Sequence, residues 1–254
     1  MQWMQIFNDA NVVAFLLLYF RFAALFIAVP IFSHNSIPMN IKAMMAFFFT
    51  VVFYGSMPPL EIALTIPSII IAILGEFMLG LVVGIVLQIT YNIITFAGGQ
   101  ISFMMGFSMA SAIDPQSGIS MPIISQFLSS LVLMILLALN LHHWILLFID
   151  HTLKTVPLGG FLMSEDVFNY IIYATSRMFM VGFVVAFPVI ALSLLADVIF
   201  GMLMKTMPQF NLLVIGFPIK ITVAFAILIA TLGTIMLLLK GEIQAAFNTL
   251  EMFF

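Results

Sequence analysis

The sequence has no cysteine and few charged residues. Of its 254 residues, 7% are Asp, Glu, Lys or Arg, and 64% are apolar. Soluble domains are typically about 25% charged and about 45–50% apolar. The lack of cysteine excludes disulfides and thiolate metal sites. The low charge excludes an ordinary soluble monomer, because so much exposed apolar surface would drive aggregation.

The charges that are present are spread thinly and sum to -3. A nucleic-acid surface needs clustered Lys and Arg, so nucleic acid is not an expected partner. The sequence contains no Gly-x-x-x-x-Gly-Lys phosphate loop and no His-Glu-x-x-His metal helix. We therefore predict a protein that is not an enzyme and has no cofactor. No Pro/Ser-rich linker or charge run divides the chain, which favours a single domain over residues 1–254.

Long apolar segments predict an all-α protein of the membrane class. The expected helices are 10–32, 43–57, 67–97, 122–149, 164–200 and 219–239. A helix needs about 20 apolar residues to cross a bilayer, so the second is short for a span and the third and fourth are long. Ser164, followed by two acidic residues, is a typical helix N-cap. The mismatched lengths indicate either tilted helices or shielding by partner chains.

A stripe of small and polar residues surrounds one charge in the third helix. Ala72, Glu76, Gly80, Gly84 and Gln88 follow at four-residue spacing, so they share one helix face. The two glycines would let another helix approach closely. A charge at this depth costs roughly 2.5–3.5 kcal/mol. We predict that Glu76 accepts hydrogen bonds from a neighbouring helix, with proton transfer as the alternative, and that Glu76→Gln retains much of the function.

Three further charges lie in apolar segments, and three histidines lie close together. Arg21, Arg177 and Asp197 are expected to pair with opposite charges on other helices. The histidines are His142, His143 and His151, beside Asp150 and Trp144. They offer metal-ligand side chains, but histidine at a membrane interface beside tryptophan is the more ordinary interpretation.

The segment 98–120 alternates small, weakly polar residues with Phe and Met. The residues of interest in it are Gly106, Phe107, Ser108, Met109, Asp114, Pro115 and Gly118. The Asp-Pro pair is a turn signal. Irregular backbone at membrane depth occurs only inside protein or beside a water-filled cavity. Two interpretations stay open: a surface loop between two spans, or a pore-facing loop whose apolar side chains form a deformable seal.

A second interruption precedes the last helix. Its residues of interest are Pro208, Gln209, Asn211, Gly216, Pro218 and Lys220. The two prolines remove backbone donors, and the amide side chains can bond the groups that the break leaves free. We expect Gly216 to adopt a conformation that would strain a larger residue. Lys220 is expected to reach a carboxylate or a helix C-terminus on an adjacent chain. A transport site or a simple turn are the alternatives.

Taken in order, these motifs resemble the FliR family of flagellar type III export-gate proteins, which is called SctT in injectisomes. The resemblance is carried by three pieces: Gly75-Glu76 with Gly80 and Gly84; Gly106 to Pro115 followed by Met121-Pro122; and Pro208-Gln209-x-Asn211 with Gly216-x-Pro218-x-Lys220. Length and helix order agree over nearly the whole chain. Lys205 stands where the family pattern has Arg, which keeps the charge.

The resemblance implies one subunit of a right-handed helical pore complex in the bacterial inner membrane, at the flagellar basal body. Its partners would be FliP- and FliQ-like subunits, with FlhB- and FlhA-like export proteins nearby and unfolded flagellar proteins in transit. Residues 1–200 would form a FliP-like portion with a plug loop at about 98–120, and 201–254 a FliQ-like hairpin. The main rival is a secondary transporter or small-solute channel with Glu76 as coupling group. A membrane enzyme that uses the histidines is a third class.

Overall fold

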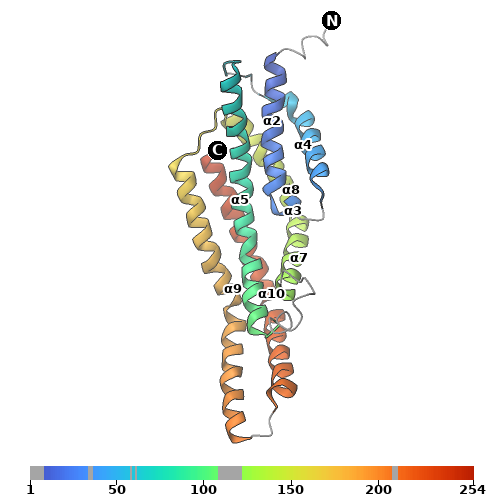
Figure 1. The fold of residues 1–254 in the computed structure, drawn as a ribbon, viewed down its shortest axis with the longest axis vertical. Coiled ribbons are helices and arrows are strands. Elements are labelled where there is room, and N and C mark those ends of the chain that lie inside the picture. The colour runs from blue at the N-terminus through green and yellow to red at the C-terminus, as the bar shows by residue number, and fades with distance from the viewer. Residues whose placement is uncertain (1–8, 34–36, 58, 61, 108–121, 208–210) are drawn as a thin grey trace. The chain divides into compact units, whose positions relative to one another are not determined.

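The computed structural model describes residues 9–33, 37–57, 59–60, 62–107, 122–207 and 211–254. All regular elements in these residues are helical, which confirms the predicted fold class. They are α2 (Asp9–Ala28), α3 (Pro30–Ser33), α4 (Met39–Phe53), the 3-10 turn Tyr54–Ser56, α5 (Ile66–Met104), α7 (Ile123–Ala138), α8 (Leu141–Thr155), α9 (Glu165–Thr206), the π-helix Leu212–Gly216 and α10 (Phe217–Phe253) (Figure 1).

The helices form two compact units, and several helices contribute to both. The first unit holds residues 1–90, 136–174 and 243–254, and the second holds residues 91–135 and 175–242. The proposed division of the chain at residue 200 into FliP-like and FliQ-like portions rests on the resemblance and stays a proposal.

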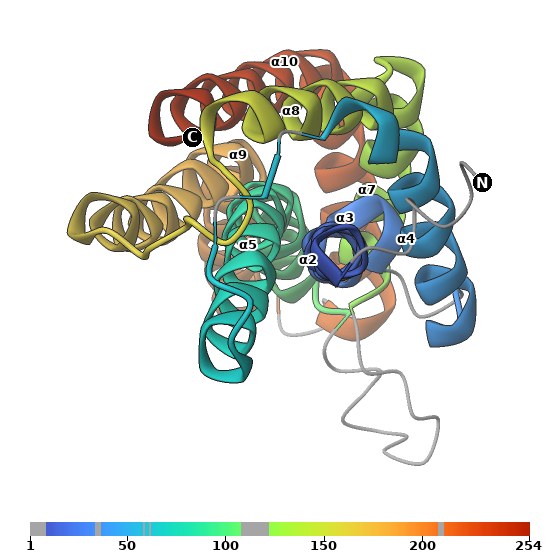
Figure 2. The ribbon, with the colours of Figure 1, turned by 90° about the horizontal axis from the view of Figure 1, so that it is seen from above.

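In the first unit, α4 packs against α2 through aromatic side chains. Phe22 and Phe26 of α2 are buried, and their rings lie 5.9 and 5.4 Å from that of Phe49 on α4. The two helices run side by side in both ribbon views (Figures 1 and 2). Such aromatic pairs add about 0.5–1.5 kcal/mol each beyond the apolar area they bury, so they hold the short α4 on its neighbour.

The same unit places the C-terminal turns of α10 beside α8 (Figure 2). The ring of Phe247 lies 5.8 Å from Trp144, and that of Phe254 lies 6.1 Å from Phe148 and 5.6 Å from Phe161. Phe148, Phe247 and Phe254 are buried. The end of α10, α8 and the loop that follows α8 therefore share one core.

In the second unit, α5 and α7 lie antiparallel in close contact. A Cβ atom added to Gly98 would lie 2.5 Å from the Cα atom of Ser125. The Ser125 hydroxyl donates to the Thr95 carbonyl oxygen at 2.7 Å, and the Thr95 and Ser129 hydroxyl oxygens are 3.0 Å apart. Small residues and hydroxyls thus replace large apolar side chains where α5 and α7 meet.

Two predicted boundaries differ from the structure. Residues 98–104, expected to be irregular, continue α5 to Met104. The predicted single helix 122–149 is wrong, because α7 ends at Ala138 and α8 begins at Leu141. Asn140 between them adopts the left-handed conformation with φ of 60°, which asparagine tolerates better than most residues. By contrast, the Ser164 N-cap is confirmed: its hydroxyl accepts the Val167 N–H at 3.3 Å.

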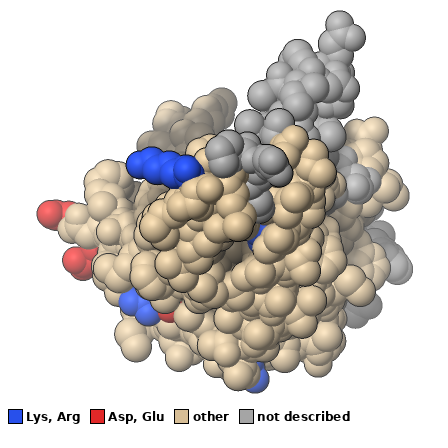
Figure 3. Space-filling view, turned by 90° about the horizontal axis from the view of Figure 1, so that it is seen from below, with Lys and Arg blue, Asp and Glu red and all other residues tan. Residues whose placement is uncertain are grey.

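Among the described residues, five helical stretches are long and apolar enough to cross a membrane, and α7 with α8 would make a sixth. One of the five is Met39–Ser56, with 18 residues, because α4 begins earlier than predicted and a 3-10 turn extends it. Many large apolar side chains are exposed, among them Phe183, Phe187 and Leu195 of α9. Charged side chains are sparse on the face drawn in Figure 3. Lipid or partner helices must therefore cover this surface.

Candidate functional site

A buried ion pair lies at the centre of the first unit. The Arg21 guanidinium on α2 donates from Nε to Glu76 Oε2 at 2.5 Å and from Nη2 to Oε1 at 3.0 Å. Both side chains are fully buried. The two parallel hydrogen bonds match the planar fork of arginine to the carboxylate. The pair joins α2 and α5, which are far apart in the sequence.

Further hydrogen bonds tie this pair to α8 and to the loop after it. The Gly159 N–H donates to Glu76 Oε1 at 2.7 Å. Arg21 Nη1 donates to Thr152 Oγ1 at 3.3 Å, and Nη2 donates to the Val156 carbonyl oxygen at 3.4 Å. Gly159 has φ of 77°, a conformation that glycine adopts at little cost. The ion pair is therefore the point at which three helices and one loop are fixed together.

The predicted small-and-polar stripe faces neighbouring elements along its length. A Cβ atom at Gly80 would overlap the Arg21 carbonyl oxygen, and one at Gly84 would overlap the Ala28 side chain. Ala72 lies against Gly159. Farther along α5, Gln88 Oε1 accepts a hydrogen bond from the Ser33 hydroxyl at 3.3 Å. The geometry is that of a packing seam in which Glu76 accepts hydrogen bonds; the functional role of these residues stays a prediction.

The turn at the end of α5 contains the first of the predicted plug residues. The Gly106 N–H bonds the Phe103 carbonyl oxygen at 3.0 Å, and the Phe107 N–H bonds the Ser102 carbonyl oxygen at 3.2 Å. Gly106 has φ of 86°. This is a Schellman motif, in which a left-handed glycine satisfies the last carbonyls of a helix. Glycine at position 106 is therefore explained by the turn that ends α5, which the sequence pattern did not indicate.

The remaining plug residues, Ser108, Met109, Asp114, Pro115 and Gly118, lie outside the described residues, as do Pro208 and Gln209 of the second interruption. Their predicted roles are carried forward as proposals.

The described part of the second interruption consists of Asn211, a short π-helix and the start of α10. Gly216 is buried and is the last residue of the π-helix Leu212–Gly216. Asn211 Oδ1 accepts the Val214 N–H at 3.3 Å, so this amide acts within its own chain. Pro218 lies in the first turn of α10, where a missing N–H costs little.

Two ion pairs connect α9 and α10 within the second unit. Lys220 Nζ donates to Asp197 Oδ1 and Oδ2 at 2.7 and 2.8 Å. Its partner is therefore in the same chain, not in the adjacent chain that the sequence predicts. Arg177 forms a bidentate pair with Glu242, at 2.7 Å from Nε and 2.8 Å from Nη2. The expected pairing of the apolar-segment charges is therefore observed, and it sets the antiparallel register of this hairpin.

The histidines do not form a metal site in the part of the chain that the structure describes. His142 and His143 have ring centroids 4.2 Å apart. No group of three or more His, Asp or Glu side chains with metal-binding geometry occurs among these residues.

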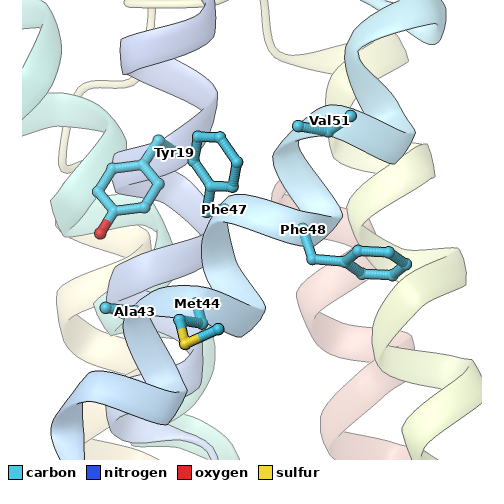
Figure 4. Close-up of a pocket in the computed structure, with 6 residues that line it drawn as sticks. All are labelled: Tyr19, Ala43, Met44, Phe47, Phe48 and Val51. Carbon is cyan, nitrogen blue, oxygen red and sulfur yellow. The ribbon is translucent and has the colours of Figure 1, made fainter.

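An apolar groove of about 600 Å³ lies beside α2 and α4 in the first unit. It is lined by Tyr19, Ala43, Met44, Phe47, Phe48 and Val51 (Figure 4). Its lining has no carboxylate, imidazole or amine. The groove therefore suits an apolar neighbour rather than chemistry on a substrate.

Comparison with known proteins adds family evidence to this geometry. The sequence profile described as "Bacterial export proteins, family 1" matches residues 12–246. The flagellar biosynthetic protein FliR of Bacillus subtilis (strain 168) is 31% identical over 244 residues, covering 94% of this chain and 93% of the relative. FliR of Escherichia coli (strain K12) is 28% identical over 230 residues, covering 91% and 88%. FliR of Aquifex aeolicus (strain VF5) is 24% identical over 251 residues, covering 97% and 95%.

Long apolar helices, two of them joined by a buried ion pair, define a helical membrane protein, and the profile match makes it one of the bacterial export proteins. The chain belongs to the FliR family, which confirms the predicted resemblance. It is a component of the flagellar export apparatus.

Proposed function

We propose that the chain is a core subunit of the export gate, which forms and seals the channel through which unfolded flagellar proteins leave the cytoplasm. The observation that carries the proposal is the length of its apolar helices. α5 has 39 residues, α9 has 42 and α10 has 37. At about 1.5 Å per residue, each measures roughly 55–63 Å, against a hydrocarbon core of about 30 Å. Lipid covers only part of such helices, so partner helices must cover the rest.

The partners follow from the family. We propose a hetero-oligomer with FliP- and FliQ-like subunits in the bacterial inner membrane at the flagellar basal body, with FlhB- and FlhA-like export proteins beside it. A lone transporter would not need apolar helices of this length. The Glu76 carboxylate accepts three hydrogen bonds, two from Arg21 and one from the Gly159 N–H, which also supports a structural role over ion coupling.

The seal is proposed to consist of Gly106, Phe107, Ser108, Met109, Asp114, Pro115 and Gly118. Apolar constrictions block ions because water leaves them, and methionine can re-pack around a passing chain. Removal of residues 106–118 in frame is therefore expected to leave the complex assembled but its membrane permeable. The measurement is ion leak from vesicles that carry the complex, together with recovery of its subunits in mild detergent. Vesicles as tight as those with the parent complex would exclude this segment as the resting seal.

The second interruption is proposed as an assembly element, comprising Pro208, Gln209, Asn211, Gly216, Pro218 and Lys220. Replacing both amides, Gln209→Ala with Asn211→Ala, is expected to reduce recovery of this chain with its FliP- and FliQ-like partners in affinity purification. Part of the loss should come from the cap on Val214, worth about 1 kcal/mol.

Asn211→Ser in place of Asn211→Ala is the matched control, because serine keeps a capping oxygen. Gln209→Ala with Asn211→Ser then reports the contribution of Gln209 alone. Full recovery of the partners with both amides replaced by alanine would contradict the assembly role.

A further inference from the structure

We infer that Phe217 is a positioning residue for the seal. Its ring supports the turn that ends α5. The second interruption, which places Phe217, therefore sets the direction in which the proposed sealing segment leaves the helix. This inference rests on the proposed function. It concerns the turn at Gly106 and the start of α10 at Phe217. These lie more than a hundred residues apart in the sequence and are in contact within the second unit.

The contact is close and involves the edge of the ring. A Cβ atom at Gly106 would lie 2.8 Å from Cε1 and 3.2 Å from Cδ1 of Phe217. Real Cβ atoms do not approach a carbon this closely, so a larger residue at Gly106 would require the Phe217 ring to move. Gly106 therefore meets two requirements at once, the left-handed conformation of the Schellman motif and the space for Phe217.

The turn that ends α5 has a defined conformation. Its two backbone hydrogen bonds, from Gly106 and Phe107, fix the conformation, and Met105 before it is fully buried. The chain leaves α5 at Phe107, a member of the proposed seal. A shift of the ring would therefore change where that residue lies.

The position of Phe217 depends on the second interruption. It is the first residue of α10, directly after the π-helix Leu212–Gly216. π-helical turns are rare and frequently lie at functional sites. Lys220, one turn farther along α10 and largely buried, anchors that helix to Asp197 of α9. A neighbouring subunit that docks on the break would thus transmit its position to the turn through the Phe217 ring.

The test is Phe217→Ala in the full complex, with ion leak and subunit recovery measured on the same membranes. We expect recovery close to that of the parent and a several-fold rise in leak. Phe217→Tyr, which keeps the ring, should remain tight. Phe225→Ala is the matched control, because Phe225 is a partly exposed phenylalanine on the same helix and should not raise leak.

Gly106→Ala gives an independent test of the same contact. It should raise leak as well, because its Cβ displaces the ring and alanine is strained in the left-handed conformation. Combined with Phe217→Ala, the part of its effect that acts through the ring should not add. If Phe217→Ala lowers recovery, Phe217→Leu, which keeps apolar bulk without the ring edge, takes its place with the same expected leak.

The outcomes separate the two proposals. If removal of residues 106–118 causes leak while Phe217→Ala and Phe217→Leu stay tight with full recovery, the positioning role is wrong and the seal stands. If the removal itself leaves the membrane tight, the seal is wrong, and the positioning role falls with it.

Discussion

Glu76→Gln is expected to destabilise the protein by about 3–5 kcal/mol, the usual cost of removing one partner of a buried ion pair. Glutamine has nearly the same shape, but it is neutral and leaves the Arg21 charge without compensation. Arg21 is fully buried, so water cannot replace the carboxylate. This differs from the sequence-based expectation that Glu76→Gln retains much of the function, because that expectation did not include a buried cation as the partner.

The measurement is the stability of the purified complex against thermal unfolding in mild detergent, with secreted flagellar protein as the functional assay. The matched control is Lys154→Ala. Lys154 pairs with Asp150 at 2.6 Å, but its side chain is 68% exposed, so its loss should change stability by no more than about 0.5 kcal/mol. A Glu76→Gln protein as stable as the parent that no longer exports would instead assign Glu76 to proton transfer.

A double replacement separates charge from shape. Arg21→Met with Glu76→Leu removes both charges and fills the space with apolar atoms, which is often close to neutral for a buried pair. Here we expect the double variant to regain only part of the lost stability. The Gly159 N–H loses its acceptor, and an unsatisfied buried donor costs about 1–3 kcal/mol. The double variant should therefore be more stable than Glu76→Gln and less stable than the parent.

Patterns within one helix could be predicted, because they depend on local spacing. The stripe of residues at four-residue spacing around Glu76 and the Ser164 cap are of this kind, and both match the structure. The partner of Glu76 could not be predicted, since Arg21 lies 55 residues away and nothing in helical periodicity says which faces meet. The same holds for Lys220, whose carboxylate is on α9 of its own chain.

Helix ends were harder to place for a different reason. Around the break at Asn140 the polar residues are Asn140, His142 and His143, and the apolar residues on both sides favoured one continuous helix. A single left-handed residue makes the break. At Gly106 the sequence pointed to a flexible loop, whereas the glycine ends α5 through two specific hydrogen bonds. In a protein with so few polar residues, helix boundaries depend on individual backbone conformations rather than on a change in hydrophobicity.

The second large effect is expected from the glycines that let α5 approach α2. Gly80→Ala adds one methyl group, which would overlap the Arg21 carbonyl oxygen and lie 2.8 Å from the Ala24 side chain. Overpacking of this kind typically costs about 1–3 kcal/mol. The nearest atom belongs to the backbone, so α2 itself must shift. Glu76 lies one turn before Gly80 on α5, so this shift of α2 moves Arg21 away from its partner. The loss of stability should therefore exceed the usual range for overpacking.

The control is Gly99→Ala on the same helix, where an added Cβ atom meets nothing within 4 Å. There the only effect is the better helix propensity of alanine, about 1 kcal/mol in favour of the folded state. The two variants carry the same chemical change, so thermal unfolding in mild detergent should move in opposite directions, down for Gly80→Ala and up for Gly99→Ala. Equal shifts would show that α5 and α2 are not in close contact at Gly80.

Gly84→Ala distinguishes a steric effect from an electrostatic one. Its Cβ atom would overlap the Ala28 side chain, two turns from the ion pair. If separation of the helices alone matters, Gly80→Ala and Gly84→Ala should lower stability about equally. If displacement of Arg21 matters as well, Gly80→Ala should be the more damaging. In that case its combination with Glu76→Gln should cost less than the sum of the two, because a pair that is already broken cannot be lost again.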